Sequence, residues 1–193
     1  MLTRLYFIIM WLMFFSLIFG CTAENNEDPP IWNGIKLGET KYADVIDSLG
    51  APMSSSYTQL GWSNILTISY PSPSSMFRNE IIIDDACDCV VYVRNQLLGG
   101  SETDHSKLSD HLAIHGRPQL ALGGGNYGSA GFLIYLEKGI ALEAQISRPI
   151  EDAIVFAVHY FVPQSQNQFM TTWGSNLNSN IITIEEWEDL IPK

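Results

Sequence analysis

The sequence predicts an α+β protein of two tandem units, each a short helix packed on a three-stranded antiparallel sheet. Three observations carry this prediction: a capped amphipathic helix after residue 40, a second copy of that helix 66 residues later, and alternating apolar strands after each copy. Helices this short do not hold in water alone, so each is expected to cover one face of its sheet.

The first helix is expected over residues 41–49. Thr40 is a suitable N-cap, Gly50 suits a left-handed residue after the helix, and Pro52 blocks its continuation. Apolar side chains recur at the spacing i, i+3, i+4 and i+7, and they form one stripe made of Tyr42, Val45, Ile46 and Leu49.

The same punctuation returns in the second half of the chain. The cap, the glycine and the proline reappear in register as Ser106, Gly116 and Pro118. A repeat of this length favours duplication of one structural unit. We therefore expect a second helix that docks on its own sheet.

Each helix is followed by a loop and three segments with strand character. In the first unit, residues 54–61 are expected to be a loop, and the strands are 64–70, 80–83 and 89–94. In the second unit the loop is glycine-rich, and the strands are 132–136, 140–147 and 153–162. The last of these is apolar almost throughout, which predicts a central strand covered on both faces.

The N-terminus has the pattern of a lipoprotein signal peptide. Residues 1–20 hold one basic residue and an apolar run of 15 residues, which is shorter than a membrane span. Cys21 follows a glycine and is the expected site of lipidation. The alternative is an uncleaved N-terminal anchor helix, and both interpretations place the rest of the chain outside the cytoplasm.

The remaining sequence divides into four segments. Residues 21–30 are polar, acidic and proline-ended, which indicates a disordered tether. Residues 31–98 form the first expected unit and 99–163 the second. Residues 164–193 are a polar tail that ends in a short helix, because a capping box begins at Thr183.

The charge of the chain limits its partners. The net charge is −11, and removal of residues 1–20 leaves nine basic against 21 acidic residues, or −12. Such a charge repels nucleic acid and anionic lipid headgroups. We expect membrane attachment through acyl chains, no nucleic-acid binding, and a protein partner that is basic or neutral.

Residues 34–52 resemble the Gly-x-Thr-x-x-x-Val-x-x-x-Leu-Gly-x-Pro signature of the SmpA/OmlA (BamE-like) lipoproteins. The resemblance implies a small lipid-anchored α+β domain of the cell envelope, and some members of the family are accessory subunits of outer-membrane protein assembly. Two such units in tandem resemble the architecture of the β-lactamase inhibitor protein, a secreted binding module. The resemblance therefore implies a tandem of BamE-like units.

Two cysteines remain if Cys21 is acylated. Cys87 and Cys89 flank a single aspartate, and an extracytoplasmic setting permits a disulfide between them if a tight turn brings their Cα atoms close. The alternative is a pair of reduced thiols at the start of a strand.

The second helix carries two histidines on its docking stripe. His111 and His115 are four residues apart, so they share a helix face and are weak candidates to hold one metal ion, with His105 or Asp110 as a third ligand. No fixed metal-site spacing supports an ion. We expect two partly buried imidazoles, no bound metal and no cofactor.

Aromatic residues near the two expected loops are candidates for partner binding. They are Tyr57 and Trp62 in the first unit and Tyr127 and Phe132 in the second. Aromatic side chains dominate binding hot spots, so matching loops on two stacked sheets would give a binding surface. The alternative is that Trp62 and Phe132 open strands and pack inward.

We expect a membrane-anchored lipoprotein of the cell envelope that binds another protein and is not an enzyme, because no nucleophile or carboxylate constellation stands out. Two alternatives stay open. One is an inhibitor-type module that binds a secreted enzyme. The other is a metal-binding or redox protein that uses the histidine or cysteine pair.

Overall fold

The protein is described by a computed structural model covering residues 30–60, 63–73, 77–97, 106–123, 130–145, 153–173 and 181–182. The expected signal peptide, lipidation site, most of the tether and the C-terminal helix lie outside these residues. The elements are β1 (Ile31–Trp32), β2 (Ile35–Lys36), α2 (Tyr42–Leu49), β3 (Ser54–Leu60), β4 (Ser63–Tyr70), β5 (Asn79–Asp84), β6 (Cys89–Gln96), β7 (Ser106–Lys107), α3 (Leu108–His115), β8 (Leu120–Leu122), β9 (Ala130–Tyr135), β10 (Ile140–Gln145), β11 (Ile154–Phe161), α4 (Gln166–Thr172) and β12 (Ile181–Ile182).

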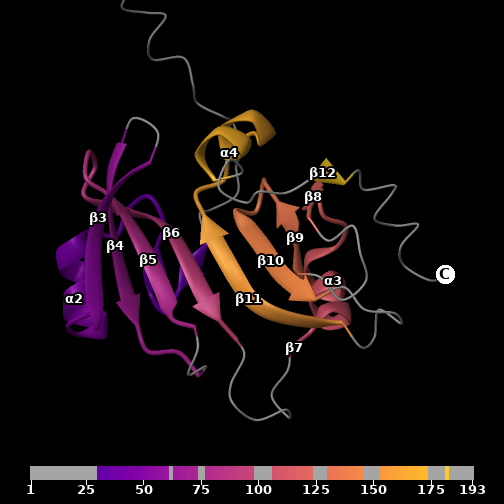
Figure 1. Cartoon of the computed structure of the whole chain (residues 1–193), viewed down its shortest axis with the longest axis horizontal. Helices are drawn as coiled ribbons and strands as arrows, with labels where there is room; N and C mark the ends of the chain where they lie inside the picture. Colours follow the sequence, from indigo (N-terminus) through magenta and orange to yellow (C-terminus); the bar gives the residue numbers. More distant parts are fainter. Residues whose placement is uncertain are drawn as a thin grey trace, which may run out of the picture.

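One antiparallel sheet of ten strands runs across the described part of the molecule (Figure 1). Its order is β12-β8-β9-β10-β11-β6-β5-β4-β3, and β7 pairs additionally with β11. The prediction of two units, each a helix on a separate three-stranded sheet, is therefore wrong. The protein is mainly β, with one continuous sheet and three short helices in its described residues.

Two features of the strands explain this correction. Residues 54–60, expected to be a loop, form β3 and pair with β4 along their whole length. The two halves of the sheet then join where β6 pairs with β11 in the register Val93↔Tyr160. Open strand edges leave backbone donors and acceptors without partners, and this pairing satisfies both inner edges at once.

The helices keep the predicted 66-residue register. Gly50 follows α2 and Gly116 follows α3, and both have positive φ, as expected for a glycine after a helix. The hydroxyl of Tyr70 donates to the Gly50 carbonyl at 2.9 Å, and the hydroxyl of Tyr135 donates to the Gly116 carbonyl at 2.9 Å. Each half thus ties its helix end to its own sheet in the same way.

The predicted N-cap of the first helix is wrong. The hydroxyl of Thr40 accepts a hydrogen bond from the Lys36 backbone N–H at 2.8 Å, so it stabilises the chain before the helix. Lys41 is the capping residue, and its backbone N–H donates to the Asp44 carboxylate at 3.2 Å. The Asp44 side chain therefore takes part of the capping role.

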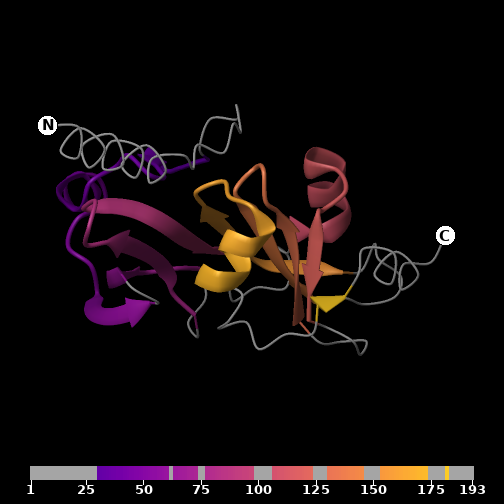
Figure 2. The ribbon, with the colours of Figure 1, turned by 90° about the horizontal axis from the view of Figure 1, so that it is seen from above.

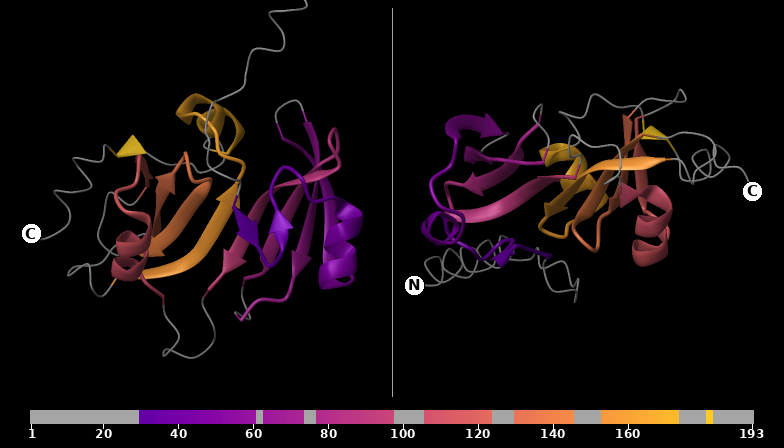
Figure 3. Two further views of the ribbon diagram at one scale, coloured as in Figure 1. Left: turned by 180° about the vertical axis from the view of Figure 1, so that it is seen from behind. Right: turned by 90° about the horizontal axis from the view of Figure 1, so that it is seen from below.

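The two faces of the sheet carry different cover. α2 and the β1–β2 hairpin pack on one face of the first half, and α3 packs on the same face of the second half (Figure 3). α4 packs on the opposite face of the second half through Phe169, so α3 and α4 lie on opposite sides of the strands between them (Figure 2). Tyr160 contacts the cores of both halves on the first of these faces.

The remaining strand predictions agree with the structure within a few residues. β11 lies between β10 and β6, which confirms the predicted central strand. Ser165 caps α4 by accepting from the Gln168 backbone N–H, so residues expected to be irregular tail begin with a helix.

Candidate binding pocket

A pocket of about 270 Å³ opens on the sheet face opposite α2 and α3. We call this surface the pocket face; it carries Thr67, Ile82, Tyr92, Ala141 and His159. Strands from both halves form the floor, and α4 forms a wall. The full lining is Thr58, Ile65, Thr67, Glu80, Ile82, Tyr92, Phe132, Ala141, His159, Phe161, Phe169 and Trp173.

The pocket face exists because side chains alternate along each strand. Leu66 and Ile68 of β4 point into the core beneath α2, so Thr67 points to the other side. Ile81 and Ile83 of β5 likewise leave Ile82 on the pocket face. The strand pairing then sets these side chains in rows that cross from the first half into the second.

A polar network crosses the junction of the halves at the floor of the pocket. The Tyr92 hydroxyl is hydrogen-bonded to Nδ1 of His159, and Nε2 of His159 lies 3.2 Å from a carboxylate oxygen of Glu143. The same Glu143 oxygen accepts from Arg94 at 3.0 Å. Tyr92 and Arg94 belong to β6, whereas His159 and Glu143 belong to β11 and β10.

The protonation states follow from burial. His159 is only 5% exposed, and burial lowers its pKa, so the imidazole is neutral at pH 7. Burial acts to raise the pKa of Glu143, but the hydrogen bond from His159 and the charge of Arg94 outweigh it and leave the pKa lowered. We therefore assign the proton of His159 to Nε2, which donates to Glu143, while Nδ1 accepts from Tyr92.

This arrangement leaves His159 without a free nitrogen. Burial also raises the pKa of the Tyr92 hydroxyl, which keeps it a hydrogen-bond donor. A general base needs an open acceptor within reach of a substrate proton, and both ring nitrogens of His159 already have partners. The network therefore fixes the pocket floor in one geometry and offers no evident base for catalysis.

Aromatic rings form the walls. The rings of Trp173 and Tyr92 stack with centroids 4.7 Å apart, and the rings of Phe132 and His159 form a T-shaped pair with centroids 5.4 Å apart. Phe161 of β11 and Phe169 of α4 have ring centroids 5.0 Å apart, so they pack between the helix and the sheet. Stacked and edge-on rings of this kind make rigid contact surfaces.

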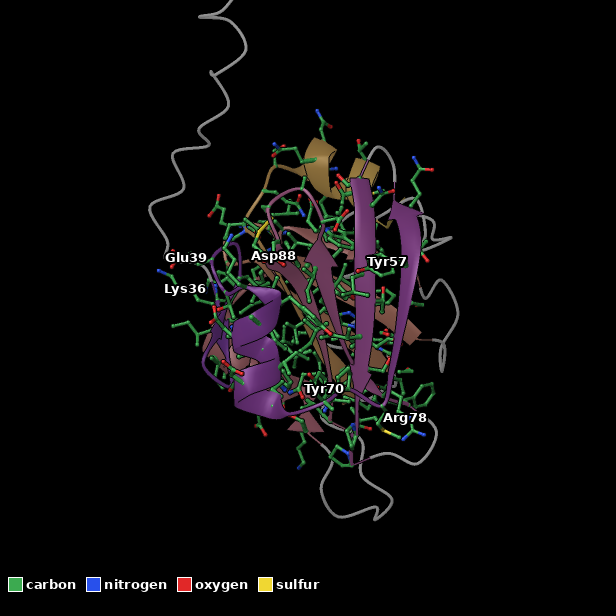
Figure 4. The ribbon with its side chains drawn as sticks, turned by 90° about the vertical axis from the view of Figure 1, so that its left-hand side faces the viewer. Lys36, Glu39, Tyr57, Tyr70, Arg78 and Asp88 are labelled. Atoms are coloured by element: carbon green, nitrogen blue, oxygen red, sulfur yellow. A yellow bond between two sulfur atoms is a disulfide. The ribbon has the colours of Figure 1, made fainter. Side chains whose placement is uncertain are left out.

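The aromatic residues predicted to bind a partner do not form one surface in the described structure. Tyr57 is 71% exposed and lies on β3, opposite Leu66, on the side of the sheet that α2 covers (Figure 4). Phe132 lines the pocket on the other face. Trp62 and Tyr127 lie outside the described residues.

The two cysteines predicted as a possible disulfide are bonded to one another. Cys87 and Cys89 form a disulfide with Cα atoms 5.2 Å apart, so of the two alternatives the structure has the bridge. Asp88 between them has a positive φ of 51°, which gives the tight turn that the bridge needs. Cys21 lies outside the described residues.

His111 and His115 stack on α3 with ring centroids 5.9 Å apart. Nε2 of His111 lies 2.6 Å from the hydroxyl of Ser106, and burial lowers the pKa of both imidazoles. In the described part of the chain, no three histidine, cysteine, aspartate or glutamate side chains gather as metal ligands.

Sequence reasoning missed the polar network. His159 lies in an apolar run that predicts a buried strand, and Glu143 lies between Leu142 and Ala144, whose alternation with polar residues predicts a strand with one apolar face. The available signal was a histidine within the strand predicted to be covered on both faces, together with a glutamate on the strand before it. Buried polar groups require partners, so these residues had to meet others.

Comparisons with protein families, curated proteins and solved structures find no match to this chain. Within the residues that the structure describes, no helix is long and apolar enough to cross a membrane.

Proposed function

We propose that this protein is a non-enzymatic binding module of the cell envelope, anchored by a lipid on Cys21, that holds another protein at its pocket face. The observation that carries the proposal is an aromatic-walled pocket on an otherwise sheet-lined surface, built jointly by both halves. Aromatic anchors in central, desolvated pockets supply most of the energy of protein interfaces.

The pocket is large enough for one anchoring side chain of a partner. Sites for drug-sized ligands hold roughly 300–1,000 Å³, and this pocket holds about 270 Å³. A single anchoring side chain suits that volume. Both ring nitrogens of His159 already have hydrogen-bond partners, which supports binding over catalysis. These hydrogen bonds hold the pocket floor in one geometry, so it needs no rearrangement when a partner docks.

Site-specific photo-crosslinking in intact cells tests the proposal. A photoreactive residue replaces Thr58, which is exposed at the rim of the pocket, and a control replaces Asp47, which is exposed on α2 at the opposite face. We expect a discrete crosslinked partner from position 58 and none from position 47. Equal capture from both positions, or no capture from position 58, contradicts the proposal.

The lipid anchor has its own test. A Cys21→Ser variant removes the thiol that would carry the acyl chain, so we expect it to leave the membrane fraction. Retention of the variant in that fraction would favour the alternative of an uncleaved anchor helix.

A further inference from the structure

One carboxylate in the pocket makes no ion pair within the described residues. Glu80 of β5 is half-buried in the lining, and within the described residues its carboxylate makes no hydrogen bond or ion pair. A partly buried carboxylate is less well solvated than one in open water, so a bound cation would stabilise it.

The nearest basic side chain is already engaged. Arg94 stands across the strands from Glu80, yet its guanidinium donates to Glu143 at 3.0 Å and lies 5.5 Å from the centre of the Phe77 ring. Neutral His159 adds no positive charge. Glu80, Arg94 and Glu143 together therefore leave one negative charge at the pocket, in a chain of net charge −11.

The walls also suit a cation. Trp173, Tyr92 and Phe132 line the same pocket as Glu80. A cation within about 6 Å of the face of such a ring is attracted by the electron density of the ring. Arg94 over Phe77 shows the same type of contact at the edge of this surface.

We propose that the pocket takes the guanidinium group of an arginine side chain from the protein partner, with Glu80 as its counter-ion and the aromatic wall as its stacking surface. This inference rests on the proposed function and names the chemistry of the partner. Arginine fits better than lysine because its planar group stacks on rings and pairs with a carboxylate through two parallel hydrogen bonds.

Butylguanidinium and butylurea are matched probes for this inference. They have nearly the same shape and size, but only the first is charged. Each is titrated into the folded protein while backbone and indole N–H signals are followed by NMR. We expect butylguanidinium to shift the signals of residues around the pocket, Trp173 included, and butylurea to bind about tenfold more weakly or not at all.

The variants Glu80→Gln and Glu137→Gln complete the test. Both remove one negative charge, but Glu137 is exposed in the β9–β10 turn and does not line the pocket. We expect Glu80→Gln to weaken butylguanidinium binding about tenfold and Glu137→Gln to leave it within about twofold. Since Glu80 has no partner to lose in the described structure, the variant is expected to fold normally.

Three outcomes overturn the inference: no binding of butylguanidinium, equal binding of butylurea, or equal effects of the two variants. These outcomes are separate from failure of the proposed function. Crosslinking from position 58 without guanidinium binding would leave a protein-binding face whose anchor is not arginine. Guanidinium binding without crosslinking would leave a cation site without a protein partner.

Discussion

The two halves of the sheet follow one plan but place their polar chemistry differently. In each half a helix of eight residues precedes the strands and ends at a glycine whose carbonyl accepts from a tyrosine hydroxyl. The described disulfide lies in the first half, whereas all four histidines of the sequence lie beyond residue 104. The shared helix and strand arrangement therefore accommodates a disulfide in one half and histidines in the other.

The side chains through which α2 and α3 pack on the sheet show the difference most clearly. α2 buries Val45 completely, and α3 has the half-buried His111 at the matching position. α3 instead buries Leu108, nearly one turn earlier. The pocket face differs as well, because α4 covers it in the second half and leaves the strands of the first half facing the pocket. One half thus supplies an open floor and the other supplies the wall.

Exchanging the two helix residues gives the largest expected effect. Val45→His places an imidazole where the side chain is 0% exposed, so we expect a loss of about 3 kcal/mol in the free energy of unfolding. His111→Val removes a half-buried ring that is hydrogen-bonded to Ser106 through Nε2 and has no partner at Nδ1 in the described structure, so its effect should stay within about 1 kcal/mol.

Urea denaturation of both variants measures this asymmetry. Equal losses in the two variants would mean that the helices are docked in the same way, which contradicts the difference in burial. A Val45→Ala control separates loss of packing from burial of a polar ring.

Acid should destabilise the second half first. Burial lowers the pKa of His111, His115 and His159, so the unfolded chain binds protons near pH 6.5 more readily than the folded one. Stability is therefore complete above about pH 6.5 and falls as the pH drops below it. The lowered pKa of Glu143 adds a further loss only below its ordinary value of 4.5.

Thermal melts between pH 7.5 and 5.5 check this expectation, with hydrogen exchange at β9–β11 compared with β4–β6. The His111→Val variant should show a shallower decline. A melting temperature that stays constant or rises towards pH 5.5 would contradict the neutral state assigned to His159.

The repeat in the sequence predicted the helices well and the sheet poorly. Gly50, Gly116 and the apolar stripe are local signals, and both helices ended where these signals placed them. The pairing of β6 with β11 joins residues more than 60 positions apart, and no local pattern records it. Ser54–Leu60 begins with three serines and has no charged residue, so its composition resembled a loop although it forms the strand at the end of the sheet.

The pocket was harder to predict for the same reason. Its walls come from seven strands and a helix, and its lining residues are spread over more than 100 positions of sequence, from Thr58 to Trp173. Phe132 was a candidate because of its residue type and position. Tyr92, Glu143 and His159 lay within predicted strands, but which strands were neighbours could be known only from the fold.

The two tyrosines that donate to the glycine after each helix should contribute equally to the free energy of unfolding. Tyr70→Phe and Tyr135→Phe each remove one hydrogen bond of 2.9 Å to a glycine carbonyl, so we expect a loss of about 1 kcal/mol from each. Chemical denaturation of both single variants and the double variant measures this. A difference above about 1 kcal/mol between the two single variants would show that this hydrogen bond does not stabilise the two halves equally.

Reduction of the disulfide should have a small and local effect. Cys87 and Cys89 close a ring over only one intervening residue, so the bridge removes little entropy from the unfolded chain, and we expect its loss to cost about 1 kcal/mol. Thiol titration before and after denaturation reports the bridge, and a Cys87→Ser/Cys89→Ser variant reports its effect on stability. Global unfolding on reduction would contradict this local role.

The central claim is that the pocket itself holds the partner, and filling it tests that claim most directly. Thr67→Phe adds an aromatic ring from the floor strand β4, and Ser48→Phe adds the same ring on the exposed side of α2. We predict that crosslinking from position 58 is abolished by Thr67→Phe and unchanged by Ser48→Phe, with both proteins folded by thermal melting. Undiminished crosslinking in the folded Thr67→Phe variant would contradict the account.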